Sequence, residues 1–296
     1  MAFIIIESIF FISLLNKQLT ITIMKKLLIF VFALVATNVS AQYYAGISGG
    51  FAMPSATTLM GTELTGTTLT TEYGSFGEGM NFSVHAGYFF NEKFGIELKA
   101  GFLNGSDQIR DTYKTGEVTD AIAYARVMRV APTLVYNISD KVYGKFGAIV
   151  PVGGKTVAEF TRTTSAGAAG NIVTVGEQEY KGKFGAGVTG TLGYKYSLGN
   201  NLNLFAEVEY IGLSVDRDTS VFTDFKMTLP AALGGTVFTM ANLPIVNHPV
   251  VGNVPKEYTY VDTLPTTNTD KSKVLGETAA YSSFGINFGI TYTFGK

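Results

Sequence analysis

The stretch Phe284–Lys296, FGINFGITYTFGK, decides the fold because its side chains alternate in size and polarity. Successive side chains of a β-strand point to opposite faces of the sheet. One face of this strand is therefore bulky and apolar, and the other is small and polar. The bulky face consists of Phe284, Ile286, Phe288, Ile290, Tyr292 and Phe294.

The same alternation recurs along the chain and predicts eight strands. The connections between these strands alternate between short turns and long Thr- and Gly-rich stretches, which sorts the long loops to one end of an up-and-down sheet. Transmembrane barrels have this asymmetry, with short periplasmic turns and long extracellular loops. The runs are 43–52, 79–90, 94–104, 122–137, 142–153, 179–198, 202–216 and 281–294; the turns are 91–93, 139–141 and 199–201; the long stretches are 53–78, 105–121, 154–178 and 217–280.

The size of the interior decides which face points outward. An eight-stranded barrel is only just wide enough inside for side chains to fill it. Six large residues from each strand would overfill that space, whereas Gly, Ser, Thr and a few charges fit. We therefore predict an all-β fold, an eight-stranded antiparallel up-and-down transmembrane β-barrel whose apolar face meets hydrocarbon.

Composition is consistent with this class of fold. Only 15% of the 296 residues are charged, against about 25% in an average soluble domain. The formal net charge of −1 gives no indication of a basic surface that would bind nucleic acid. The chain has no cysteine and only two histidines, His85 and His248, so we expect no disulfide, no metal site with nitrogen or sulfur ligands and no cofactor.

The N-terminal region has the pattern of a secretory signal. Met24-Lys25-Lys26 is followed by an apolar segment and then by Val39-Ser40-Ala41, a small-residue cleavage site. We predict a signal peptide over 24–41 and a mature barrel domain over 42–296. Residues 1–23 precede a complete signal and are interpreted as the result of an early start codon, with a genuine hydrophobic extension as the alternative.

With these features the chain resembles the small outer-membrane β-barrel family of Gram-negative bacteria, the eight-stranded OmpA-, OmpX- and OmpW-type proteins. The last strand supplies the specific match, at Asn287, Gly289, Tyr292 and Phe294. The resemblance implies an outer-membrane location among lipid and lipopolysaccharide. It also implies recognition of this C-terminal signal by the barrel assembly machinery. Gly295-Lys296 follow the final aromatic residue, where many members of the family end.

Charged residues on the small face are predicted to meet in the lumen. Three acidic and three basic residues occupy positions on this face of their strands. Charged groups can remain buried when they are paired with one another. A salt-bridged plug is favoured over an ion path or gate, because the bore of such a barrel is narrow. The predicted lumen charges are Glu97, Lys99, Arg129, Lys145, Glu207 and Glu209.

Two further patterns bear on catalysis. Gly185, Gly187 and Gly190 spell G-x-G-x-x-G, but a strand pattern follows where a nucleotide-binding loop needs a helix. His85 has lumen parity, which is wrong for a lipid-modifying hydrolase facing the membrane. We therefore predict no catalytic residues and no enzyme.

The leading functional hypothesis is a structural or surface-interaction role, through membrane integrity, adhesion or ligand binding by the outer loops. Passive porin-like transport of small or apolar solutes is the alternative, and a lipid-modifying enzyme is the third. Loop 217–280 contains an apolar stretch, Met227 to Val246. This loop is expected to cap the barrel mouth, form an extracellular hairpin, or bind an apolar solute.

Overall fold

A computed structural model describes residues 42–55, 58–65 and 67–294. The predicted signal peptide over 24–41 and the upstream segment 1–23 lie outside the described residues. Apart from three short 3-10 helices, all regular secondary structure in the described residues is β-strand, which confirms the all-β prediction. None of the described helices is long and apolar enough to cross a membrane.

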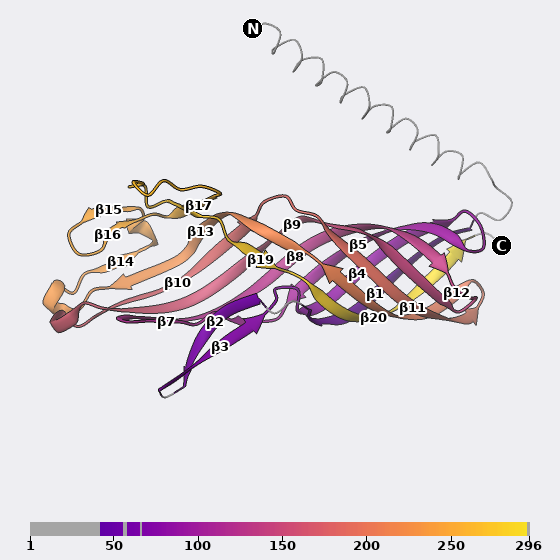
Figure 1. The fold of residues 1–296 in the computed structure, drawn as a ribbon, viewed down its shortest axis with the longest axis horizontal. Helices are drawn as coiled ribbons and strands as arrows, with labels where there is room; N and C mark the ends of the chain where they lie inside the picture. The colour runs from indigo at the N-terminus through magenta and orange to yellow at the C-terminus, as the bar shows by residue number, and fades with distance from the viewer. Residues whose placement is uncertain (1–41, 56–57, 66, 295–296) are drawn as a thin grey trace, which may run out of the picture.

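Eight strands form a hydrogen-bonded ring in which each strand pairs antiparallel with two neighbours (Figure 1). The pairing of β8 with β9 joins the two ends of this sequence of neighbours. In order around the ring the strands are β1 (Gln42–Pro54), β4 (Gly79–Phe89), β5 (Phe94–Gly105), β8 (Glu117–Asn137), β9 (Val142–Ser165), β11 (Gly187–Gly199), β12 (Leu202–Gly212) and β20 (Ser283–Phe294).

The alternation in β20 is expressed as predicted. All six bulky residues of this strand are exposed on the outside of the ring, and Phe288 retains 63% of its surface. Their neighbours Ser283, Gly285 and Asn287 are buried on the inside. The apolar face of the strand therefore points outward and the small face packs the interior.

The three predicted short turns join strands at one end of the ring, which we call the turn end. Asn91 Oδ1 accepts hydrogen bonds from the backbone N–H groups of Lys93 and Phe94, each at 2.9 Å. Asn200 and Asn201 have φ angles of 49° and 66°, a left-handed conformation that Asn tolerates well. Local side-chain chemistry thus sets these turns.

Two of the eight predicted runs were wrong as single strands. The run 179–198 is divided, because β10 (Asn171–Gly182) ends before β11 begins at Gly187. The run 202–216 is divided at Leu213, after which β13 (Ser214–Thr228) leaves the ring. At the first break the chain enters the ring from an extension of its sheet, and at the second break it leaves the ring for that extension.

The long stretches are richer in structure than the loop prediction implies. Strands β8 and β9 continue well past the ring and pair with each other from Glu117↔Thr164 onward. Strand β10 adds to the extended part of β9, and β13 adds to β10. The other strands here are β2 (Thr58–Thr65), β3 (Thr68–Gly74), β6 (Gln108–Ile109) and β7 (Thr112–Lys114).

Much of the segment predicted as loop 217–280 continues this extension of the sheet. It runs from β13 to β19 and extends the molecule on the side opposite the C-terminus (Figure 1). Buried Phe222, Phe225 and Met227 form its apolar cluster with Leu229, Phe238 and Ile245. The strands after β13 are β14 (Val237–Thr239), β15 (Ile245–His248), β16 (Gly252–Val254), β17 (Glu257–Val261), β18 (Lys273–Leu275) and β19 (Thr278–Ala280).

One part of β9 lacks a partner on one side. The β9–β11 register ends at Ile149↔Gly187, and the β9–β10 register begins again at Thr156↔Tyr180. Residues 150–155 therefore face a gap in the wall, and a register shift toward β8 occurs beside Pro151. A cavity of about 270 Å³ occupies this gap.

Glycine is required where a large interior side chain crosses a strand. A Cβ on Gly193 would lie 2.3 Å from Cζ of Tyr143, whereas a Cβ on Gly190 of the same strand would meet nothing within 4 Å. We expect Gly193→Ala to destabilise the protein by about 1–3 kcal/mol, the usual cost of overpacking. Gly190→Ala is the matched control in urea unfolding of the lipid-reconstituted protein, and equal midpoints for the two variants would contradict this packing.

Candidate functional site

The six predicted lumen charges all lie inside the ring. Glu97 and Lys99 are on β5, Lys145 on β9, and Glu207 and Glu209 on β12. These side chains share the parity of the small residues, so the strand pleat points them inward. Arg129 on β8 is also buried. We call this group, with its polar partners, the lumen network.

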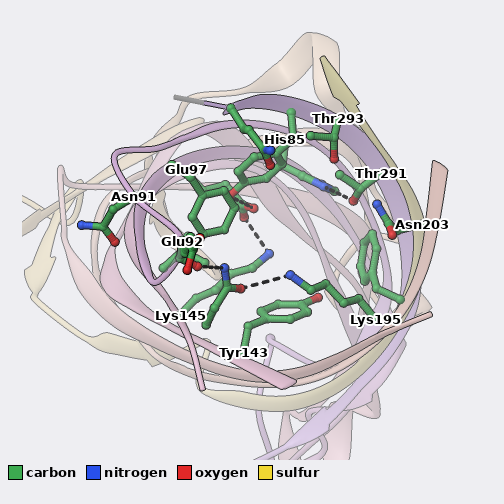
Figure 2. A pocket seen from close by; sticks show the side chains of 16 residues that line it. His85, Asn91, Glu92, Glu97, Tyr143, Lys145, Lys195, Asn203, Thr291 and Thr293 are labelled. Carbon is green, nitrogen blue, oxygen red and sulfur yellow. Dashed lines mark hydrogen bonds and ion pairs between the residues drawn. The ribbon is translucent and has the colours of Figure 1, made fainter. Parts of the chain in front are cut away.

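Lys145 is the centre of one half of the lumen network. Its Nζ lies 2.9 Å from Oε1 of Glu97 and 2.6 Å from Oε1 of Glu207, as Figure 2 shows in part. The three side chains come from strands that are not neighbours in the ring. One ammonium group thus bridges two carboxylates across the interior.

The second half of the network spans the full width of the ring. Lys99 forms an ion pair with Glu209, and the strands that carry them, β5 and β12, are opposite each other in the ring order. Glu209 also accepts a hydrogen bond of 3.0 Å from Nδ2 of Asn287. A pair between opposite strands leaves little room for an open bore at this level.

Neutral side chains form hydrogen bonds with several of these charged groups. The guanidinium of Arg129 donates to Oδ1 of Asn81 at 2.5 Å. The phenol of Tyr44 donates to Glu97 at 3.0 Å, and that of Tyr143 donates to Glu207 at 2.7 Å. Sequence reasoning did not identify these partners, although Asn81 has the lumen parity that it used.

An apolar layer, which sequence reasoning also missed, lies above the network toward the long-loop end. Leu103, Ile149 and Ile211 are each at most 2% exposed and belong to one apolar cluster with Ala131. Each of the three residues lies on the same face of its strand as the charged residue that precedes it there. Extending the alternation by two or four residues would have placed them inside the ring.

A cavity of about 230 Å³ lies on the turn-end side of the network (Figure 2). His85 lines it, with Nε2 3.2 Å from Oγ1 of Thr291, so this histidine fills the interior as a polar group. Lys195 also lines the cavity and donates to Oδ1 of Asn137 at 3.2 Å. The cavity ends at Lys145 and Glu97, where the charged layer begins.

The residues of the predicted C-terminal signal occupy two different environments. Asn287 is buried against Glu209, and a Cβ on Gly289 would lie 2.3 Å from the carbonyl oxygen of Ile47. Tyr292 and Phe294 point outward with their rings 5.0 Å apart. The first pair therefore has a packing role in the wall, and the second pair forms part of the outer surface.

The other sequence motifs acquire no site. Gly187 begins β11, so a strand and not a helix follows the G-x-G-x-x-G pattern. His248 lies on β15 with its ring 5.1 Å from that of Phe238, far along the chain from His85. Among the residues that the structure describes, no group of three or more His, Cys, Asp or Glu side chains is placed to hold a metal ion.

No protein-family model matches the sequence, and no curated protein matches it. Solved structures similar to this chain include a major outer membrane protein from Thermus thermophilus, at 10% identity and a TM-score of 0.38, covering 86% of this chain and 100% of that one. Another is the outer membrane protein OprG from Pseudomonas aeruginosa, at 13% identity and a TM-score of 0.34, covering 86% and 97%. At these scores the similarities do not decide the architecture, which rests on the strand pairings.

A third is Ail, the attachment invasion locus protein of Yersinia pestis, in complex with the heparin analogue sucrose octasulfate. Its identity is 10% and its TM-score 0.30, with coverage of 86% of this chain and 97% of that one.

Lys145 supplies a test of the network. Lys145→Met leaves Glu97 and Glu207 buried with no cation between them, and breaking a buried pair in this way costs about 3–5 kcal/mol. We expect a correspondingly lower unfolding midpoint in urea for the reconstituted protein. Adding Glu97→Gln and Glu207→Gln should recover part of the loss, while Lys141→Met in an exposed turn should change nothing. A Lys145→Met protein as stable as the Lys141→Met control would contradict the pairing.

Proposed function

We propose that the chain is an integral protein of the bacterial outer membrane, a transmembrane barrel with a closed lumen that acts through the sheet beyond its long-loop end. The observation that carries this proposal is the filling of the ring interior in two successive layers. Ion pairs across the interior, one of them between the opposite strands β5 and β12, form the first layer, and Leu103, Ile149 and Ile211 form the second.

The outer surface of the ring supports a membrane location. Exposed Phe, Ile, Leu, Val and Tyr side chains occur on strands all around it, for example Ile47, Leu98 and Leu192. Ring closure also gives each strand two partners, with a local exception at residues 150–155 of β9, and a sheet surrounded by lipid requires such partners because no water can satisfy its backbone. Outer-membrane lipid and lipopolysaccharide are the proposed surroundings.

We place the turn end in the periplasm and the extended sheet outside the cell. Tyr292 and Phe294 then lie near the periplasmic interface, where an aromatic girdle is expected. In this orientation Asn287, Gly289, Tyr292 and Phe294 supply the proposed signal for the barrel assembly machinery.

The proposed function is a structural or surface-interaction role that involves no catalysis. The sheet formed by β10, β13 and β17, with the apolar cluster around Phe225, gives a structured projection in the segment predicted as a loop. A structured extracellular surface loses little entropy when it binds a partner. Adhesion, ligand binding or stabilisation of the lipopolysaccharide layer are functions that such a surface serves.

Passive uptake of small apolar solutes is a second candidate, and one specific observation favours it. The gap beside residues 150–155 of β9 contains a cavity of about 270 Å³ that Val152 and Phe184 line with exposed apolar surface. A solute entering there would pass sideways through the wall without crossing the lumen network. Uptake of a radiolabelled apolar solute by expressing cells measures this directly.

Planar-bilayer recording tests the closed lumen. The wild-type protein should show no discrete conductance steps, because both interior layers block ions. A quadruple variant, Lys99→Ala, Glu209→Ala, Ile149→Ala and Ile211→Ala, removes parts of both layers and should conduct. Discrete steps from the folded wild-type protein would refute the closed lumen.

Trimming the projection tests the surface role. Phe222 and Lys256 approach each other, with the Phe222 N–H 3.1 Å from the Lys256 carbonyl oxygen. Residues 223–255 can therefore be replaced by an Asn-Gly turn while the ring is left intact. We expect normal outer-membrane levels but reduced adhesion of expressing cells to epithelial monolayers, or reduced resistance to detergent. Unchanged adhesion and unchanged resistance would count against the surface role, and lipid A of altered mass in expressing cells would favour an enzyme.

A further inference from the structure

The opening beside residues 150–155 of β9, here called the wall gap, carries a group of lysines. Lys155 and Lys181 are the first residues beyond the last β9–β10 pair, so they lie on adjacent strands at the same level. Lys183 follows, where the chain runs from β10 to β11. All three lysines line the cavity of about 270 Å³, and among the described residues no acidic side chain lines it.

Two of these lysines have an acidic partner outside the cavity. Lys155 pairs with Glu179, and Lys183 pairs at 2.7 Å with Asp262, whose side chain is 85% exposed. Exposed pairs of this kind contribute little to stability. Lys181 has no carboxylate at ion-pair distance in the part of the chain that the structure describes. The wall gap therefore carries a positive charge that the protein itself does not neutralise.

A smaller cavity of about 20 Å³ adjoins the wall gap and does not change this balance. Lys181 lines both cavities, and Asp216 and Arg217 line the smaller one. Arg217 is paired at 2.6 Å with Glu277, and Oδ1 of Asp216 accepts a hydrogen bond from the hydroxyl of Thr278. Each nearby acid thus has a partner other than Lys181.

The side of the wall gap toward the turn end is apolar. Val152 and Phe184 line the cavity with side chains that are 60% and 86% exposed. Phe146 on β9 and Val188 on β11 continue this exposed apolar surface down the outside of the ring. An apolar path therefore leads from the lysines along the outer wall.

The level of the lysines fits the outer boundary of a membrane. A tilted strand crosses the hydrocarbon in about 9–11 residues. Counted from Val142 at the turn end, β9 leaves the hydrocarbon near Val152, and Lys155 lies just beyond it. With the turn end in the periplasm, the lysines are at the level of the head groups of the outer leaflet.

We propose that the wall gap binds one molecule of lipid A, the phosphorylated glycolipid of the outer leaflet. A phosphate group lies among Lys155, Lys181 and Lys183, because lysine ammonium groups bind phosphate as point charges. An acyl chain runs along Val152 and Phe184. The inference rests on the proposed outer-membrane location and deepens it by naming a lipid partner and its site. A lipid held there also closes the sideways path that solute uptake would need.

Native mass spectrometry of the full chain, released from detergent micelles, tests the site by counting bound lipid. Lipid A is the probe. Its dephosphorylated form lacks the charged group, and phosphatidylglycerol presents a phosphate on a different lipid. We expect a one-to-one complex with lipid A that is at least tenfold tighter than the complex with either of the others. Inorganic phosphate, which has no acyl chain, should not displace lipid A at equal concentration.

Lysine variants locate the bound lipid. The gap triple, Lys155→Gln with Lys181→Gln and Lys183→Gln, should weaken lipid A binding at least tenfold. Lys181→Arg keeps the charge and should retain most of the binding. A control triple removes the same charge from exposed positions beyond the ring and should leave binding unchanged: Lys226→Gln, Lys256→Gln and Lys271→Gln.

Thermal unfolding without lipid separates a binding role from a structural one. Lys181 forms no ion pair, so Lys181→Gln should melt at the wild-type temperature and still bind lipid A more weakly. The proposal fails if dephosphorylated lipid A or phosphatidylglycerol binds as tightly as lipid A, or if inorganic phosphate displaces it. It also fails if the gap and control triples have the same effect, or if Lys181→Gln lowers the melting temperature. Cell fractionation decides the membrane location independently, so a protein found in the outer membrane without a preference for lipid A would overturn this site alone.

Discussion

The narrow interior of the eight-strand ring is the constraint on which the rest of the structure depends. A ring of this size has room inside for small side chains and for a few long ones that interlock. Gly193 shows how tight this limit is, since the ring of Tyr143 lies where a Cβ would be. Bulky residues are therefore excluded to the outside, and the exterior becomes apolar as a direct result of the crowding within.

The same crowding explains why charges inside the ring occur as a network. A single buried ion would be costly, but the ammonium group of Lys145 is in ion-pair contact with the carboxylates of both Glu97 and Glu207. Tyr44 and Tyr143 occupy remaining acceptor positions on these carboxylates. Long side chains that reach across the interior fill space and satisfy one another at the same time.

Sequence alternation predicted the ring well and predicted poorly what extends from it. Parity placed Glu97, Lys99, Arg129, Lys145, Glu207 and Glu209 inside because a strand has a strict two-residue period. It did not reveal that β8 and β9 continue beyond the ring, since the residues there lie in a different environment and lose the size contrast. The ion-pair partners could not be predicted either. Parity shows whether a side chain points inward, but it does not show its level along the ring axis or which side chain lies across from it. Tertiary pairing likewise divides the runs 179–198 and 202–216, each of which was predicted as a single strand.

The link between Lys99 on β5 and Glu209 on β12 has a consequence for how the molecule forms. Strands on opposite sides of the ring meet only after all the strands between them are in place. In a partly formed ring both groups would remain hydrated, so their attraction would not stabilise that intermediate. The cost of desolvating the two groups is compensated only in the closed ring, so the final strand pairing is cooperative. A ring with one strand too few or too many would not bring the two groups together.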